Sequence, residues 1–128
     1  MDVRSWSPGT PGSAADGRYA EAAFRVGEVC ERAGDLWTAA QWFREAAEAG
    51  RPGARLRLGA VLGRLADSLA DRPDAGTPDP GVLLAEAARW LTGSPEAATP
   101  AGIGLITDML NRQQRQAARR ALENAAPR

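Results

Sequence analysis

Apolar side chains recur at every third or fourth position along most of this chain, and glycine or proline interrupts the pattern at intervals. This spacing gathers them on one face of an α-helix, whereas a half-buried strand would need strict alternation. The first such stretch comprises Tyr19, Ala22, Ala23, Val26, Val29, Cys30 and Ala33. We therefore predict a helix from about residue 19 with this face buried, and we expect an all-α fold.

Two further helices follow between residues that cap or break helices. Asp35 is placed to cap the second helix after the turn at Gly34, and that helix ends before Gly50. A third helix is predicted over residues 54–70, where leucine and valine form one stripe. Short loops between consecutive helices predict antiparallel hairpins.

The C-terminal half repeats a cap followed by proline. Asp79 and Pro80 open a fourth helix that ends near residue 92, and a helical region over 100–125 follows. The polar stretch from Asn111 divides this region, so we favour two helices over one there. Its buried side is expected at Ile103, Ile106, Leu110 and Leu122. The chain is thus predicted to have five to six helices.

The domain organisation follows from length and composition. The first residues contain Pro8 and Pro11 among glycine and serine, which predicts a flexible arm over residues 1–18. The chain has 128 residues, a usual length for a single domain. We therefore expect one helical domain over residues 19–126.

An internal repeat is visible in residues 23–50. An apolar and small pair, Val26 and Gly27, precedes the Gly34–Asp35 turn, and small and aromatic positions follow on the second helix. Those positions are Ala39, Trp42, Phe43, Ala46, Ala47 and the closing Gly50. The segment resembles one repeat of the tetratricopeptide or Sel1-like family. Small residues let two helices approach closely, and a ring such as Phe43 fills the space between them.

A second, altered copy follows the first. Gly59 lies 32 residues after Gly27, and EAARWL at 86–91 matches TAAQWF at 38–43 at a separation of 48 residues. A fainter third copy has Ala117, Ala118 and Leu122 at the matching positions. The resemblance implies a short, right-handed α-solenoid of helical hairpins, and its alternative is a helical bundle whose alanine-rich faces imitate the repeat.

Several catalytic chemistries lack their residues. The chain contains neither histidine nor lysine, which excludes a histidine base, a histidine-containing zinc site and a phosphate loop with its lysine. The single cysteine, Cys30, is expected on the core face of the first helix and inert. We expect no catalysis, no cofactor and no metal.

The resemblance implies that the chain binds another protein on the concave face of its first helices. In this sequence the corresponding residues are Glu21, Phe24, Glu28, Glu31, Arg32, Leu56 and Arg64. The residues from the first hairpin are acidic and include one aromatic residue, Phe24, which we expect to be exposed, so the expected partner is a basic helix or peptide. Weak self-association through the C-terminal arginines of another copy would satisfy the same chemistry.

The alternative function is nucleic-acid binding by a C-terminal row of arginines. The row consists of Arg112, Arg115, Arg119 and Arg120. Sixteen basic residues balance sixteen acidic ones, so no global field attracts nucleic acid. The abundance of arginine without lysine is also typical of a GC-rich genome such as an actinomycete's. No apolar run suits a signal peptide or a membrane span, and we expect a cytoplasmic protein.

Overall fold

The computed structural model describes residues 14–71, 76 and 78–125, and these residues form helices, turns and no strand. The predicted all-α class is confirmed. The chain divides into two compact units, Met1–Ala54 and Arg55–Arg128. We call them the hairpin unit and the three-helix unit and describe each separately. The sequence had predicted a single domain over residues 19–126.

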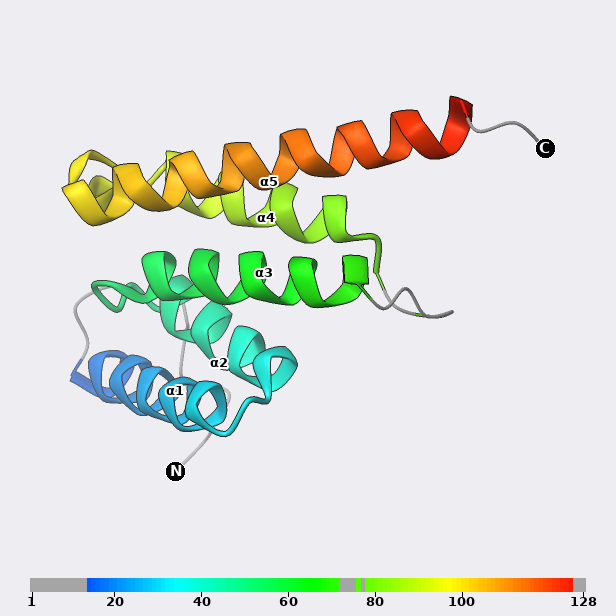
Figure 1. Ribbon diagram of the computed structural model, residues 1–128. Coiled ribbons are helices and arrows are strands. Elements are labelled where there is room, and N and C mark those ends of the chain that lie inside the picture. Colours follow the sequence, from blue (N-terminus) through cyan, green and yellow to red (C-terminus); the bar gives the residue numbers. More distant parts are fainter. Residues whose placement is uncertain (1–13, 72–75, 77, 126–128) are drawn as a thin grey trace. The chain divides into compact units, whose positions relative to one another are not determined.

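The described residues of the hairpin unit form two antiparallel helices, α1 (Ala14–Arg32) and α2 (Leu36–Glu48), as Figure 1 shows. The turn between them uses Gly34 at φ 84°, a conformation that favours glycine. Asp35 caps α2 by accepting a hydrogen bond from the backbone N–H of Thr38 at 3.2 Å. The predicted hairpin and its cap are therefore confirmed.

The first helix begins earlier than its sequence pattern indicated. The structure places residues 14–18 in α1, although the sequence had predicted a flexible arm over residues 1–18. The rest of that predicted arm, residues 1–13, lies outside the described residues. Alanine is the strongest helix former, so Ala14 and Ala15 can extend a helix that apolar periodicity alone would start at Tyr19.

The buried face of α1 is rotated from the one predicted. Its buried residues are Ala20, Ala23, Phe24 and Gly27, and those of α2 are Ala39, Ala40, Phe43, Ala46 and Ala47. Val26 and Val29, predicted to be buried, are 39% and 57% exposed. The reason is the crossing point: a Cβ on Gly27 would lie 2.7 Å from Cε1 of the Phe43 ring. The glycine must face α2, and Val26 is turned outward with it.

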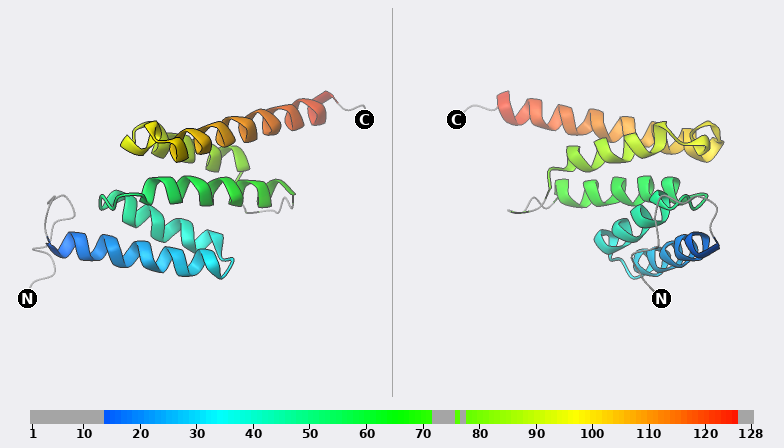
Figure 2. Two further views of the ribbon diagram at one scale, coloured as in Figure 1. Left: turned by 60° about the vertical axis from the view of Figure 1, so that its left-hand side comes forward. Right: turned by 180° about the vertical axis from the view of Figure 1, so that it is seen from behind.

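The three-helix unit contains α3 (Ala54–Asp71), whose first residue belongs to the hairpin unit, together with α4 (Pro80–Thr92) and α5 (Pro100–Ala125). A short 3-10 helix, η2 (Pro95–Ala98), precedes α5. Asp79 caps α4 through the Gly81 N–H at 2.8 Å, and Pro80 follows it, as predicted. In Figures 1 and 2 the three long helices lie side by side with alternating directions.

The C-terminal region is one helix, and the prediction of two is wrong. Its polar stretch stays helical because Arg112 packs against the neighbouring helix. The Arg112 side chain is only 18% exposed and forms an ion pair with Asp67 on α3. Arginine and glutamine are also good helix formers. An apolar residue is therefore not needed at that point of the helix.

The buried side of α5 also differs from the prediction. Gly102 and Met109, seven residues apart, face inward. A Cβ on Gly102 would overlap the backbone of Glu96 in η2, so this glycine fixes the rotation of the helix. Ile103, Leu110 and Leu122 are consequently 55%, 54% and 73% exposed, and Ile106 is half-buried.

Candidate functional site

Glu21, the first of the predicted partner-binding residues, is bound within the hairpin unit. Its carboxylate accepts a hydrogen bond from Arg51 Nε at 2.8 Å and one from Arg25 Nε at 3.0 Å. The bond from Arg51, followed by that from Arg25, lowers the pKa of Glu21 below its ordinary value of 4.5. Glu21 therefore connects α1 to the loop after α2 and does not present an uncompensated negative charge.

Phe24 is part of the core, although the sequence had predicted it as an exposed aromatic. It is 7% exposed, and its ring meets that of Phe43 edge to face with centroids 5.4 Å apart. The Arg51 guanidinium covers the Phe24 ring at 4.0 Å from its centroid. A partner cannot lay an apolar residue on Phe24, because Phe43 and Arg51 already contact it.

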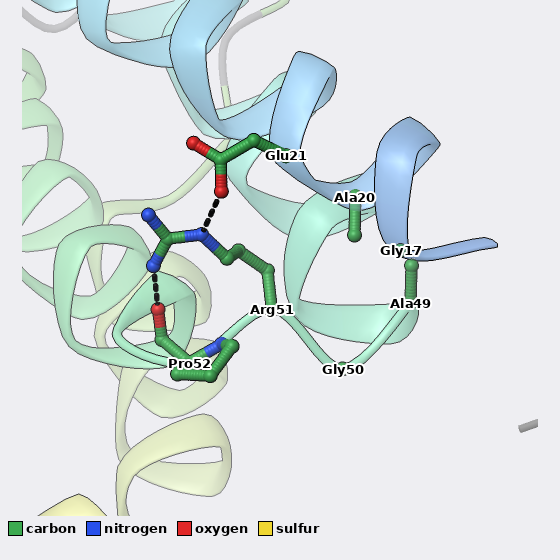
Figure 3. A pocket seen from close by; sticks show the side chains of 7 residues that line it. All are labelled: Gly17, Ala20, Glu21, Ala49, Gly50, Arg51 and Pro52. Atoms are coloured by element: carbon green, nitrogen blue, oxygen red, sulfur yellow. Dashed lines mark hydrogen bonds and ion pairs between the residues drawn. The ribbon is translucent and has the colours of Figure 1, made fainter. Parts of the chain in front are cut away.

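A hollow lies beside this group, between the N-terminal part of α1 and the end of α2 (Figure 3). Its volume is about 370 Å³, and it is lined by Gly17, Ala20, Glu21, Ala49, Gly50, Arg51 and Pro52. Figure 3 shows Arg51 reaching Glu21 with one nitrogen and the Pro52 carbonyl oxygen with another. The charged side chains of the hollow, Glu21 and Arg51, thus bond to each other and to the backbone, and this makes the hollow a poor site for a polar ligand.

The remaining predicted residues of α1 differ in exposure. Glu28 and Glu31 are half-buried, and neither is without an interaction partner. Arg32 is exposed. The acidic surface predicted for the first hairpin is therefore only partly available to a partner.

Leu56 and Arg64 lie on α3, in the three-helix unit. Leu56 is half-buried and Arg64 is exposed with an interaction partner of its own. The predicted site thus has Glu21, Phe24, Glu28, Glu31 and Arg32 in one unit and these two residues in the other.

Three of the four arginines in the proposed nucleic-acid row connect α5 to its neighbours. Arg112 forms an ion pair with Asp67 at 2.9 Å, Arg119 donates to the Ala70 carbonyl at 3.0 Å, and Arg120 pairs with Asp79. The structure describes no ion pair or hydrogen bond of the Arg115 side chain within residues 14–71, 76 and 78–125. The row is therefore not a free cationic surface of four residues.

The internal repeat has a counterpart in the contacts. In the hairpin unit a Cβ on Gly27 would meet the Phe43 ring at 2.7 Å, and in the three-helix unit a Cβ on Gly59 would meet Leu91 Cδ1 at 3.0 Å. Gly27 with Gly59, and Phe43 with Leu91, are the pairs that the sequence comparison had aligned. Each unit therefore brings its aligned glycine against its aligned large residue.

The feature that sequence reasoning misjudged is the outer face of α1. Tyr19, Val26 and Val29 are 41%, 39% and 57% exposed, Ala22 is exposed as well, and so is Ala33 in the turn that directly follows α1. We call these five residues the outer stripe. Their spacing was visible in the sequence, but periodicity does not tell which of two apolar faces packs inward. Gly27, which must face the crossing helix, is the signal that could have decided it.

Comparisons with known protein families, with curated proteins and with solved structures find no match. None of the helices formed by the described residues has the length and apolarity needed to cross a membrane. In the same residues, no three side chains of the acidic or thiol kind are grouped as a metal site would require.

Proposed function

We propose that this chain is a non-catalytic protein-interaction module built from hairpins similar to tetratricopeptide or Sel1-like repeats. The observation that carries the function is the outer stripe, an apolar face of α1 that continues to Ala33 in the following turn and is exposed in the folded chain. Exposed apolar residues that occur singly need no explanation, but a contiguous group of them is typical of an interaction surface.

The proposed repeat architecture is supported by the matched contacts of Gly27 with Phe43 and of Gly59 with Leu91. Repeats of helical hairpins leave helix faces exposed along the chain, and such proteins use these faces to bind other proteins. The proposal places the chain inside the cell, as the single half-buried Cys30 and the lack of disulfides are consistent with a reducing compartment.

Site-specific photo-crosslinking in native cells tests this proposal. A photoreactive amino acid replaces one exposed apolar residue at a time, on α1 (Val29), on α4 (Val82) and on α5 (Leu110). We expect a discrete protein adduct from at least one of these positions, and none from a matched polar position such as Gln114. Adducts at no position, with the protein folded and present at normal levels, would contradict the function.

A further inference from the structure

The outer stripe has the geometry of a helix-docking seam. Its residues, Tyr19, Ala22, Val26, Val29 and Ala33, follow one another at alternating spacings of three and four. This mean period of 3.5 residues keeps a seam facing one partner helix along several turns. The two alanines would let a partner backbone approach closely, while the valines supply the apolar contact area.

A row of arginines borders this seam. Arg18, Arg25 and Arg32 are spaced seven residues apart, and all three are exposed. At 100° per residue they lie on one side of the outer stripe, about 80° from its centre, where flanking residues contact a docked helix. The acidic residues of α1, Glu21, Glu28 and Glu31, lie further round the helix and are half-buried.

The border remains cationic despite its local contacts. Arg25 shares Glu21 with Arg51, so two guanidinium groups face one carboxylate. The Arg25 side chain is 75% exposed, and such exposed pairs contribute little and leave the charge accessible. A docked helix would therefore meet positive charge along one edge of an apolar seam.

We propose that the outer stripe binds an amphipathic helix of another protein whose flanking positions carry aspartate or glutamate. The inference rests on the proposed function. It gives the partner an acidic helix, whereas the sequence had led us to expect a basic partner. A second copy of α1 is a poor occupant, because an antiparallel pair would place the two arginine rows against each other. The apolar contacts hold the partner, and the arginines select it.

Two synthetic peptides test the inference on the full chain. Both are helical, about three heptads long, with the same leucine seam, and they carry glutamate or lysine at the seven-residue flanking positions. At low salt we expect the glutamate peptide to bind about tenfold more tightly than the lysine peptide, with the ratio falling as salt is added. Val29→Asp should abolish binding of both peptides, and the double variant Arg25→Glu with Arg32→Glu should reverse the preference.

The matched control is Arg115→Glu, which reverses an exposed arginine on α5 and should leave the peptide preference unchanged. Equal binding of the two peptides, binding of neither, or a preference that survives the double variant would overturn the inference. So would binding to phosphatidylglycerol vesicles that Val29→Asp removes while neither peptide binds, because the stripe would then be a lipid-binding surface. Circular dichroism confirms that each variant is folded.

The crosslinking experiment separates this inference from the function on which it rests. Adducts at Val82 or Leu110 with none at Val29 would retain a protein-interaction module and reject the outer stripe as its docking face. Adducts at none of the three positions would reject both.

Discussion

The rows of arginines on α5 and on α1 differ in what their side chains contact. In the three-helix unit, Arg112, Arg119 and Arg120 point to acidic side chains or a backbone carbonyl of neighbouring segments and hold α5 in place. In the hairpin unit, Arg25 and Arg32 lie exposed along the border of an apolar face. A row of arginines in a sequence therefore does not tell whether the row forms a binding surface or forms ion pairs and hydrogen bonds to neighbouring segments. Which of the two occurs depends on how the helix is rotated about its axis.

The units also differ in what fills the space at the glycine crossing. A fully buried ring, Phe43, packs on Gly27 in the hairpin unit, whereas the aliphatic Leu91 packs on Gly59 in the three-helix unit. A ring is flat and rigid, while a leucine can change rotamer. The hairpin unit should consequently tolerate changes at its crossing less well.

The largest expected effect is that of Phe43→Ala. Removing a fully buried ring costs about 3–5 kcal/mol, a large part of the stability of a small domain. Amide hydrogen exchange, followed residue by residue, should show lost protection in α1 and α2. Leu91→Ala is the matched variant, with losses expected in α3 and α4. If Phe43→Ala lowered protection in α4 and α5 as much as in α1 and α2, the comparison of separate units would be wrong.

Replacing each crossing glycine by alanine tests whether Phe43 on Gly27 is less tolerant of an added methyl group than Leu91 on Gly59. Gly27→Ala should destabilise by about 1–3 kcal/mol, because the ring 2.7 Å away must shift inside a closed core. Gly59→Ala should be within about 1 kcal/mol of neutral, since Leu91 can adjust and alanine favours the helix. Urea unfolding measures both. If the two substitutions changed the free energy of unfolding equally, the Phe43 ring and the Leu91 side chain would not differ in their ability to adjust to an added methyl group.

Several parts of the fold could be predicted from the sequence, since they depend on local signals. Asp35 and Asp79 cap the helices they were expected to cap, and the alignment of Gly27 with Gly59 corresponds to equivalent contacts. These features need only a turn residue, a cap or a small residue at a crossing.

The candidate site could not be predicted as well, because it depends on which face of a helix packs inward. α1 carries two apolar faces, and the one with Val26 and Val29 has the more regular pattern but is exposed. α5 repeats the problem, since Gly102 and Met109 rather than Ile103 and Leu110 face inward. Apolar size favours the wrong face in both helices, and a glycine in close contact determines the right one.

Arg112 and Arg115 form a matched pair on α5. Arg112→Ala should cost about 1 kcal/mol, because it removes an ion pair and a side chain that is only 18% exposed. Arg115→Ala should change the free energy of unfolding by less than about 0.5 kcal/mol. Thermal unfolding of both variants measures the difference. Equal losses would mean that Arg115 also connects helices.

The pH dependence of the hairpin unit should include a small contribution from Glu21. Arg51 and Arg25 lower its pKa in the folded state, so the contribution is present above the ordinary pKa of 4.5 and is lost as the pH falls through the lower, folded value. The effect is small because the Glu21 side chain is 40% exposed and water screens the pair. In melting experiments from neutral to acidic pH, Glu21→Gln should be less stable than the wild type near pH 7 and approach it in acid. A gap that stays constant with pH would contradict this account.

The most direct test of the account asks whether the outer stripe belongs to the core or to the surface. The measurement is the free energy of unfolding of Val29→Asp, with Ala23→Asp as its matched control on the buried face of α1. We predict that Val29→Asp changes it by no more than about 0.5 kcal/mol, whereas Ala23→Asp, which buries a charge, removes several kcal/mol. A loss of about 2 kcal/mol or more for Val29→Asp would place Val29 in the core and contradict the assignment of this face to a partner.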